Sequence, residues 1–580
     1  MDKSHLQNLR HSAAHLLAAA VKDLYHGAQN AIGPAIENGF YQDFDMGKWT
    51  VSEADLPKIE KRMREMLKKW GPFEEQEVTV ERALKDFRDN PYKVELINDF
   101  AKEGKKITEN NPGNFLDLCK GGHSKNPKVE LKNFKLLSVA GAYWKGDEKK
   151  KMLTRIYGTL FPTREELDKY LWQLQEAKKR DHRKLGRELD LFVISENIGK
   201  GLPLLTPKGY QIRRQILEYE YKLEQQSGFQ QVFTPHLARS EMYKKTGHWQ
   251  HYRDVMYAPF GIDGDEYVLK PMNCPHHYMI YASKPRSYRE LPIRLSEPGT
   301  CYRYEKTGEL AGLLRVRALS IDDSHILMTD SQIESEFALC IAMVKKMFTA
   351  FALRDFYVRL SLSDPSDAVK YIADSATWKK AGDKLEKIVR NNKLNYKIAK
   401  GEASFYGPKL DFIVKDSLGR EWQMSTLQLD LFMAKRLNLV YIDENGKDVN
   451  PVILHRGLTG SIERTLAILI EHFAGAFPLW LSPVQVAILP ISDKQVEYSD
   501  KIRQLLEVEG IRVELNPENK TIGAKIREST LQKIPYMVII GAEEIQRLYI
   551  SVRTREGKNL GVMNISQFIQ KLKAQIEKFQ

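Results

Sequence analysis

The chain has 580 residues, and because a single hydrophobic core stops growing well below that length, we expect roughly three to five domains. Its 42% hydrophobic and 28% charged content is ordinary for a globular protein. No apolar run approaches the roughly 20 residues that cross a bilayer, and the polar start (residues 1–5) is not a signal peptide. Four cysteines in so long a chain indicate a reducing compartment, so we expect a cytoplasmic protein without a membrane partner. The formal net charge of +13 favours a polyanionic partner.

Two pairs of ligand-type side chains stand in the N-terminal third. His11 and His15 are four residues apart in a segment of strong helix formers, so they share one helix face. Cys119 and His123 are also four apart, and the two glycines between them let the chain bring both side chains to one point. The four residues could form a zinc site or a metal-free hydrolytic pocket. The alternative is two surface histidines and an unrelated glycine turn.

The same third shows a mixed pattern of helices and strands. Residues 51–70 predict an amphipathic helix with a Ser cap and early acids. Residues 78–80 and 134–140 are strand-like, which indicates an α+β domain ending near residue 160. A connecting helix is predicted from residue 163 to about 184; its basic end either faces solvent or contacts phosphate.

The middle of the chain holds three separated metal-ligand types. Cys274 lies between two prolines and beside two histidines, while His325 and His455 follow in compact settings. One Cys and two His leave a tetrahedral zinc ion an open fourth position, which is the catalytic pattern. Their spacing is not that of a zinc finger, so spacing alone leaves open that they are unrelated.

Three segments of this region resemble, in order, the motifs of class II aminoacyl-tRNA synthetases. They are a helix over residues 213–226 with a strand over 231–235, a strand–loop–strand over 301–317 whose second strand covers 314–317, and a strand and helix over 457–469. Arg303, Arg315 and Arg464 in the last two fit the chemistry of amino-acid activation. Fixed guanidinium groups stabilise the negative charge of phosphate during in-line displacement of pyrophosphate. The class uses its first motif for dimer contact, so the resemblance implies a homodimer.

Shorter motifs narrow the resemblance to the threonyl-tRNA synthetases, over essentially the whole chain. They are residues 270–275, Asp323 with His325, residues 405–409, residues 427–430, and His455 with Arg456. The resemblance implies an α+β multidomain protein. Its core is the class II antiparallel sheet with helices. The implied domains are an N-terminal α+β editing domain (1–160), a linker helix (161–188), the catalytic domain (189–482) and a C-terminal α/β anticodon-binding domain (483–580).

The resemblance also assigns ligands and site residues. It implies threonine–tRNA ligation with ATP and Mg²⁺, L-threonine and tRNA(Thr) as ligands. One zinc ion would be held by Cys274, His325 and His455. Arg303 would contact the ATP α-phosphate and Arg464 the γ-phosphate. The remaining assignments are Glu305, Arg315 and Lys409 in the catalytic set, Asp323, Tyr406, Gln423, Gln428 and Ser461 for the substrate, and Asn519, Arg527, Glu544 and Arg553 for anticodon bases.

Specificity connects the zinc with the N-terminal pairs. A hydroxyl bound by zinc and Asp323 would reject valine, because valine leaves those polar groups unpaired. Serine keeps the hydroxyl and lacks only a methyl group, a difference of roughly 1–3 kcal/mol, so mischarging with serine is expected. The resemblance supplies the correcting site, an editing pocket that hydrolyses seryl-tRNA, which the family generally does without metal. Its residues would be His11, His15, Cys119 and His123, with Lys93 and Asp117.

The sequence departs from the family at three places. The family usually begins with a small ubiquitin-like domain and this sequence starts at the editing domain, which should spare aminoacylation and weaken tRNA handling. Ile321 stands where a polar Gln is expected, and Thr521 where the anticodon loop usually has Lys. The first removes one hydrogen bond from the substrate pocket, and the second removes one tRNA contact.

Two other functions fit parts of the sequence. One is a non-catalytic binder of tRNA-like elements, against which the retained Arg303, Glu305 and Arg464 argue. The other is an enzyme of narrower or different activity, either a tRNA deacylase with a decayed synthetase core or a class II synthetase for another amino acid. The Cys274, His325 and His455 set favours threonine.

Overall fold

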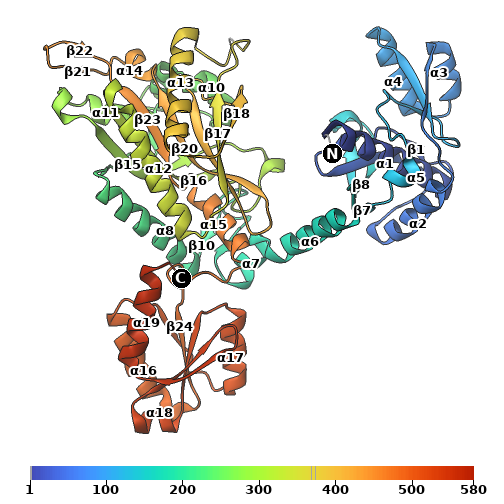
Figure 1. Ribbon diagram of the computed structural model, residues 1–580. Coiled ribbons are helices and arrows are strands. Elements are labelled where there is room, and N and C mark those ends of the chain that lie inside the picture. Colours follow the sequence, from blue (N-terminus) through green and yellow to red (C-terminus); the bar gives the residue numbers. More distant parts are fainter. Residues whose placement is uncertain (1–2, 368, 373, 580) are drawn as a thin grey trace. The chain divides into compact units, whose positions relative to one another are not determined.

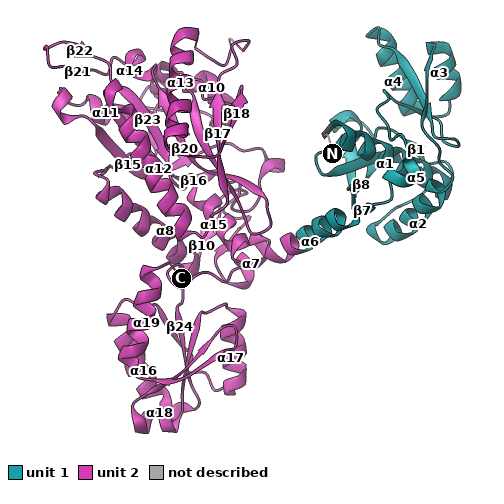
Figure 2. Ribbon diagram, viewed as in Figure 1, with its two compact units in different colours: residues 1–175 teal, residues 176–580 magenta. Residues whose placement is uncertain are grey.

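The computed structural model describes residues 3–367, 369–372 and 374–579. The chain divides into two compact units, residues 1–175 and 176–580 (Figure 2), and helix α6 (Arg164–Arg180) crosses the boundary between them. Within the described residues no helix is both long and apolar enough to cross a membrane.

The first unit is built on helix α1 (Lys3–Leu24) and a five-stranded sheet (Figure 1). Its strands follow the order β1-β3-β8-β7, with β2 paired to β3. The core is formed by the alanine- and leucine-rich face of α1, the amphipathic helix α2 and one face of the sheet. A smaller sheet, β4-β5-β6, packs with α3 and α4. The bounds are β1 (Gln29–Asn30), β2 (Ala35–Ile36), β3 (Gly39–Asp45), α2 (Leu56–Leu67), β4 (Glu74–Val78), α3 (Val80–Asp86), α4 (Pro91–Lys102), β5 (Ile107–Asn111), β6 (Asp117–Leu118), α5 (Pro127–Glu130), β7 (Phe134–Tyr143) and β8 (Met152–Leu160).

The second unit contains an eight-stranded sheet in the order β11-β15-β16-β23-β20-β19-β17-β18. The five central pairings are antiparallel, and β11 with β15 and β17 with β18 are parallel. The bounds are β11 (Gln230–Gln231), β15 (Ile293–Tyr302), β16 (Ala318–Met328), β17 (Phe356–Leu362), β18 (Tyr396–Lys400), β19 (Lys409–Lys415), β20 (Glu421–Asp430) and β23 (Val452–Gly457).

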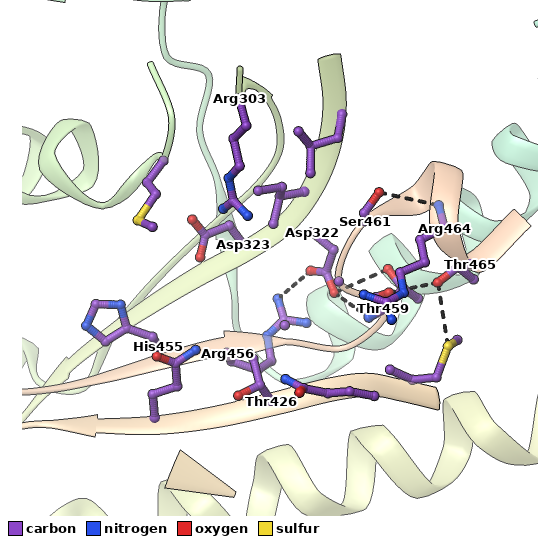
Figure 3. A pocket seen from close by; sticks show the side chains of 18 of the residues that line it. Arg303, Asp322, Asp323, Thr426, His455, Arg456, Thr459, Ser461, Arg464 and Thr465 are labelled. Carbon is purple, nitrogen blue, oxygen red and sulfur yellow. Dashed lines mark hydrogen bonds and ion pairs between the residues drawn. The ribbon is translucent and has the colours of Figure 1, made fainter. Parts of the chain in front are cut away.

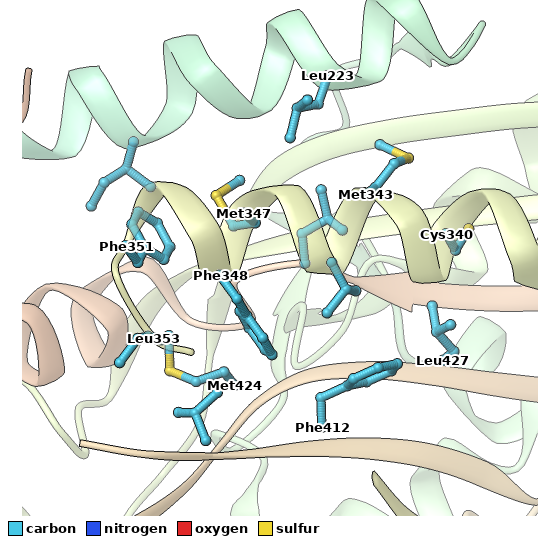
Figure 4. Close-up of a cluster of buried hydrophobic side chains, with 14 of the residues drawn as sticks. Leu223, Cys340, Met343, Met347, Phe348, Phe351, Leu353, Phe412, Met424 and Leu427 are labelled. Atoms are coloured by element: carbon cyan, nitrogen blue, oxygen red, sulfur yellow. The ribbon is translucent and has the colours of Figure 1, made fainter. Parts of the chain in front are cut away.

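Helices α8 (Pro207–Gln226), α12 (Ile333–Ala350) and α15 (Ile462–His472) join this sheet in the largest hydrophobic core. Figure 4 shows α12 with Leu223 of α8 on one side and Phe412 and Leu427 of the sheet on the other. Smaller elements surround the sheet. They are α7 (His182–Glu188), β9 (Phe192–Val193), β10 (Leu204–Leu205), β12 (Leu237–Arg239), α9 (Ser240–Thr246), α10 (His248–Tyr252), β13 (Phe260–Ile262), β14 (Asp265–Leu269), α11 (Cys274–Ala282), α13 (Ser375–Asn391), α14 (Met433–Arg436), β21 (Tyr441–Ile442) and β22 (Asp448–Val449).

The C-terminal part of the second unit carries a separate five-stranded sheet in the order β25-β24-β26-β27-β28, with its own hydrophobic core. Strands β25, β24 and β26 are parallel, and β27 and β28 continue antiparallel. The bounds are β24 (Val486–Pro490), α16 (Val496–Val508), β25 (Val513–Leu515), α17 (Ile522–Leu531), β26 (Tyr536–Ile540), α18 (Ala542–Arg547), β27 (Ile550–Thr554), β28 (Asn559–Met563) and α19 (Ile565–Glu577).

Several predicted elements require correction in the first unit and the linker. The strand expected around residues 78–80 lies earlier, because β4 ends at Val78 and the Thr79 side chain accepts a hydrogen bond from the Arg82 backbone N–H as the N-cap of α3. The predicted connecting helix is two helices, since Asp181 ends α6 and caps α7 by accepting from the Arg183 N–H. The helix predicted over 51–70 is shorter, with α2 covering Leu56–Leu67.

In the second unit, α8 begins earlier than residue 213, because Thr206 caps it and Pro207 occupies its first position. Strand β11 is Gln230–Gln231, so only Gln231 of the strand expected over 231–235 lies in it. Residues 314–317 lie in the loop that leads to β16 and are not a strand. The strand predicted over 134–140 is confirmed and extends to Tyr143.

Candidate active sites

The pairing of β16 with β23 brings two of the predicted metal ligands together. His325 on β16 and His455 on β23 are directly opposite each other in the register, and both are buried. Cys274, the first residue of α11, reaches the same point, with its Sγ 3.8 Å from His455 Nδ1. One ligand atom from each of the three residues lies within 4.8 Å of the others.

The surroundings of both histidines match those of metal ligands. The Nδ1 atoms of His325 and His277 are 2.8 Å apart, and His325 Nε2 is buried with no hydrogen-bond partner. His455 Nε2 is 3.2 Å from Asp430 Oδ2, which leaves Nδ1 on the side of Cys274. Ligating histidines characteristically use one ring nitrogen for the metal and the other for an outer partner. The residues therefore fit a zinc ion with one open position.

Burial sets the protonation of the cluster in the absence of metal. Burial, with the nearby imidazoles of His455 and His277, holds the pKa of His325 well below its usual range, so the His325 imidazole is neutral. Burial raises the pKa of the Cys274 thiol well above its usual range. A neutral imidazole can bind a cation directly, whereas the Cys274 thiol must release its proton to solvent before its sulfur can bind one.

A cavity of about 630 Å³ opens next to this cluster. It is lined by the loop after β15, by strands β16, β19, β20 and β23, and by the start of α15 (Figure 3). His325 lies behind it and is not a lining residue. The predicted residues that line it are Cys274, Arg303, Glu305, Arg315, Asp323, Tyr406, Lys409, Gln423, Gln428, His455, Ser461 and Arg464.

Three arginines give the cavity a cationic side. Arg315 Nη2 is 2.8 Å from Glu305 Oε2, and Arg303 Nε donates to the Pro271 carbonyl at 3.3 Å. Arg464 stands in the first turn of α15, whose N-cap Ser461 accepts from the Arg464 backbone N–H. Partial burial and the positive charge of Arg315 lower the pKa of Arg464. Like charges that face one cavity favour an anionic ligand between them.

Asp411, which sequence reasoning missed, fixes two side chains that line the cavity, Lys409 and Gln423. This fully buried carboxylate on β19 lies 3.0 Å from Lys409 Nζ and accepts from Gln423 Nε2 at 2.9 Å. Arg359 donates to Gln423 Oε1 at 2.8 Å, so the Gln423 amide has one orientation. On β20, Gln428 Oε1 accepts from Tyr406 OH at 2.7 Å.

Arg456 is a second residue that sequence reasoning did not assign. It is 1% exposed and forms ion pairs with Glu224 of α8 and, at 3.4 Å, with Asp322. Asp322 in turn accepts from the backbone N–H groups of Leu458 and Thr459 (Figure 3). This network fixes the turn before α15. Arg456 stands beside His455 in sequence, but local sequence cannot distinguish a buried arginine from a surface one.

The first unit brings all six predicted editing residues together. His15 Nδ1 is 2.9 Å from Asp117 Oδ2, and Lys93 Nζ is 2.6 Å from Asp117 Oδ1. Cys119 Sγ lies 3.2 Å from His11 Nε2 and 3.4 Å from His123 Nε2. A cavity of about 520 Å³ is lined by five of the six, while His123 lies behind Cys119. The two histidine and cysteine pairs therefore form one cluster rather than separate surface features.

The charges in this cluster are strongly perturbed. Burial alone would raise the pKa of the Cys119 thiol, but hydrogen bonds from His11, His123 and His15 lower it to about 3. Burial alone would lower the pKa of His15, but its bonds to Asp117 and Cys119 raise it to about 9. Near neutral pH the cluster thus contains a thiolate and an imidazolium. The ligand atoms of His11, His15, Cys119 and His123 also lie within 4.8 Å of one another, so the geometry permits a metal.

The four predicted anticodon residues stand on different parts of the C-terminal region, namely a loop, helices α17 and α18, and strand β27. Asn519 is exposed after β25 and Glu544 follows β26, so both lie at the carboxyl ends of parallel strands. Glu544 already accepts from the Gly541 N–H at 2.8 Å and from Ser551 Oγ at 2.7 Å. Arg527 is exposed on α17, and Arg553 pairs with Met537 near the other end of β26.

Comparison with known proteins assigns these parts to families. The class II core domain of tRNA synthetases (G, H, P, S and T) matches residues 260–473, and the anticodon binding domain matches residues 485–575. The second additional domain of threonyl and alanyl tRNA synthetases matches residues 110–157.

Full-length relatives cover nearly the whole chain. The threonine–tRNA ligase of Anoxybacillus flavithermus is 46% identical over 576 residues, which are 99% of this chain and 89% of the relative. That of Thermotoga maritima is 44% identical over 571 residues, 98% of this chain and 88% of the relative. A crystal structure titled as the RNA binding domain of threonyl-tRNA synthetase from Cryptosporidium parvum superposes with a TM-score of 0.65 and 33% identity, over 68% of this chain and 98% of that one. The chain belongs to the threonine–tRNA ligases, class II aminoacyl-tRNA synthetases whose substrates are ATP, an amino acid and tRNA.

Proposed function

We propose that the enzyme activates L-threonine with ATP and Mg²⁺ to threonyl-adenylate, releases pyrophosphate, transfers threonine to tRNA(Thr), and hydrolyses mischarged seryl-tRNA(Thr). The observation that carries the threonine assignment is the Cys274, His325 and His455 cluster, because Cys274 and His455 line the same cavity as Arg303 and Arg464. An amino acid bound at the cluster would present its carboxylate toward the arginines. The same cavity would then hold both the threonine recognised by zinc and the phosphates of ATP.

Cys274, His325 and His455 would hold the zinc ion, which supplies a Lewis-acid position for the amino and hydroxyl groups of threonine. Asp323, on the same strand as His325, faces the cavity and would accept a hydrogen bond from the hydroxyl. Its Oδ2 already accepts from Asn273 Nδ2 at 3.3 Å, which fixes the carboxylate beside Cys274. Ile321, two residues earlier on β16, makes the adjoining wall apolar and leaves Asp323 as the hydroxyl acceptor.

The cationic residues would bind and orient ATP. Arg303 would contact the α-phosphate, where negative charge grows as pyrophosphate leaves, and Arg464 would contact the γ-phosphate. Glu305 forms an ion pair with Arg315 and would hold it in the orientation that completes the phosphate site. Lys409 and Gln423, both fixed by Asp411, would contact the adenylate, and Tyr406, Gln428 and Ser461 complete the pocket.

The cluster in the first unit would hydrolyse seryl-tRNA without metal. Lys93 and His15 share the Asp117 carboxylate, which places two cationic groups beside the Cys119 thiolate at one cavity wall. Positive groups at a cavity wall stabilise the oxyanion that forms when water attacks an ester. His11 lines the cavity 3.2 Å from the Cys119 sulfur and can hold or move the proton of that water, while His123, 3.4 Å from the same sulfur, would hold the thiolate in place.

The remaining assignments concern tRNA and assembly. Asn519, Arg527, Glu544 and Arg553 would contact anticodon bases, with Thr521 giving one contact fewer. A homodimer is supported by apolar side chains around the motif 1 segment, where Phe233 is 83% exposed and Tyr210 is 54% exposed. We assign the protein to the cytoplasm.

We place the editing domain at 1–160, the linker at 161–188, the catalytic domain at 189–482 and the anticodon-binding domain at 483–580.

Amino-acid-dependent ATP–pyrophosphate exchange tests the zinc site. Threonine should support exchange, serine roughly 10- to 200-fold less, and valine about 10⁴-fold less or below detection, because valine leaves the zinc and Asp323 unpaired. Metal analysis should find one zinc, which is lost in Cys274→Ala. Cys340→Ala, which removes another buried thiol from the α12 core, should keep the zinc. Equal exchange with valine, or full activity in metal-free protein, would contradict the assignment.

A His11→Ala variant tests the editing site. Threonine-dependent exchange should remain at the wild-type level, whereas seryl-tRNA should accumulate in aminoacylation with serine, because the group next to the Cys119 thiolate is gone. His26→Ala removes an exposed histidine from the same unit and should leave seryl-tRNA clearance unchanged. Clearance at the normal rate in His11→Ala would show that the pocket is not the editing site.

The pH dependence of Cys119 alkylation tests the electrostatics of the metal-free pocket. With a pKa of about 3 the thiol is already ionised at about pH 5, so its reaction with iodoacetamide should keep a nearly constant rate to about pH 8. An ordinary thiol would react about tenfold faster for each pH unit over that range. Peptide mass spectrometry measures the rate, with Cys119→Ser as the blank. A rate that climbs with pH, or protection that a chelator removes, would contradict the metal-free thiolate.

A further inference from the structure

His182 connects the linker to two elements of the ATP site. It is the first residue of α7 and is 2% exposed. Its Nδ1 lies 2.7 Å from Glu471 Oε1 near the end of α15, and its backbone N–H donates to the same oxygen at 3.1 Å. On the other side of the ring, the Leu313 backbone N–H donates to Nε2 at 3.1 Å.

These partners fix the tautomer of His182. A backbone N–H can only donate, so Nε2 must carry a lone pair and the ring proton must be on Nδ1, facing Glu471. The pKa of Glu471 lies below its usual value, because bonds from His182 and the charge of Arg420 outweigh the burial that would raise it. The ring therefore donates to a carboxylate at one nitrogen and accepts from the ATP-site loop at the other.

The loop is built to approach the ring closely. Gly312, next to Leu313, has a φ of +55°, and a Cβ atom there would overlap His182 Nε2. Leu313 itself is fully buried in the large core. This loop runs from Arg303 to residue 317 and also carries Glu305 and Arg315. The hydrogen bond from the Leu313 N–H to the His182 ring therefore lies, along the chain, between Glu305 and Arg315, which both face the cavity.

The other partner of His182 belongs to the helix that carries Arg464. Glu471 is in the last turn of α15 and Arg464 is in the first, so the ring ties the loop to this helix at the end remote from the cavity. Asp181, His182 and Glu471 have ligand atoms within 4.8 Å of one another, which would permit a metal. Both ring nitrogens, however, already have protein partners, which favours a structural link over a cation site.

We propose that His182 is a positioning residue for ATP binding: its Nε2 holds the Leu313 N–H and thereby keeps the loop with Arg303, Glu305 and Arg315 in register with α15 and Arg464. The proposal rests on the ATP site described under the proposed function. It adds a residue that touches neither ATP nor threonine. Losing the acceptor leaves a buried N–H unpaired, which favours loop conformations that present the arginines poorly.

Two substitutions distinguish the two hydrogen bonds of the His182 ring, one to Glu471 and one to Leu313. In His182→Asn, the side-chain amide still donates to Glu471 from the Nδ1 position but does not reach Leu313. In His182→Gln, the longer side chain places an acceptor at the Nε2 position. Arg180→Ala is the matched control, because Arg180 bonds the His472 carbonyl and Ser417 beside the same interface without touching the loop.

Threonine-dependent ATP–pyrophosphate exchange on the full chain is the test, with KM for ATP, KM for threonine and kcat measured separately. His182→Asn should raise KM for ATP roughly tenfold and leave KM for threonine unchanged, while His182→Gln recovers most of the loss. Arg180→Ala should leave KM for ATP unchanged. In the same proteins, hydrogen exchange of the Leu313 amide should be faster in His182→Asn and near wild type in His182→Gln.

Equal KM shifts in the Asn and Gln variants, or no shift in either, would overturn the proposal, as would an unchanged Leu313 exchange rate in His182→Asn. A parallel fall in thermal stability and kcat without a selective change in KM for ATP would reduce His182 to a packing residue and also overturn it. Arg464→Ala tests the ATP site by itself. If that variant binds ATP normally, the assignment of the ATP site fails, and the role of His182 fails with it.

Discussion

The pairing of β16 with β23 is the constraint on which the proposed metal site depends. It puts His325 and His455 directly opposite each other, and both residues have outer partners, His277 and Asp430, that turn a ring nitrogen toward Cys274. A one-residue slip of this register would send one imidazole to the other face of the sheet. The register is itself held by the buried ion pairs of Arg456, which continue from β23 to Glu224 of α8 and to Asp322. The metal-type cluster, the turn before α15 and the motif 1 helix therefore share one buried framework.

Two clusters of similar side chains are given different chemistry by their surroundings. In the second unit, burial keeps His325 neutral and raises the pKa of Cys274, so neither residue carries a charge that would repel a cation. In the first unit, hydrogen bonds from three histidines produce a thiolate at Cys119, and Asp117 keeps His15 protonated. The proposed division of labour follows from this contrast. A zinc ion that binds the substrate hydroxyl discriminates against valine, which has none. It discriminates only weakly against serine, because serine differs from threonine by one methyl group, a difference of only about 1–3 kcal/mol in binding free energy.

Much of this arrangement could be predicted from sequence, and the exceptions have a common cause. Residue types with distinct chemistry, such as Cys274, Arg303 and the His11 and His15 pair, indicated the sites, and the resemblance supplied their grouping. The strand expected around 78–80 ends at Val78, because Thr79 forms a helix cap whose partner is a backbone N–H, although Val80 also has strand propensity. Asp411, Arg456 and His182 were missed because their roles depend on burial and on contacts distant in the chain. Local patterns do not show that a charged or imidazole side chain is buried.

The most direct test of the central claim is X-ray absorption at the zinc edge on the purified enzyme, with and without amino acid. The account predicts one zinc with a single sulfur ligand at about 2.3 Å and nitrogen or oxygen ligands at about 2.0–2.1 Å. L-Threonine should change the nitrogen and oxygen shell, and L-valine should not reproduce that change. Absence of zinc, a shell with two or more sulfur ligands, or a spectrum that threonine leaves unaltered would contradict it.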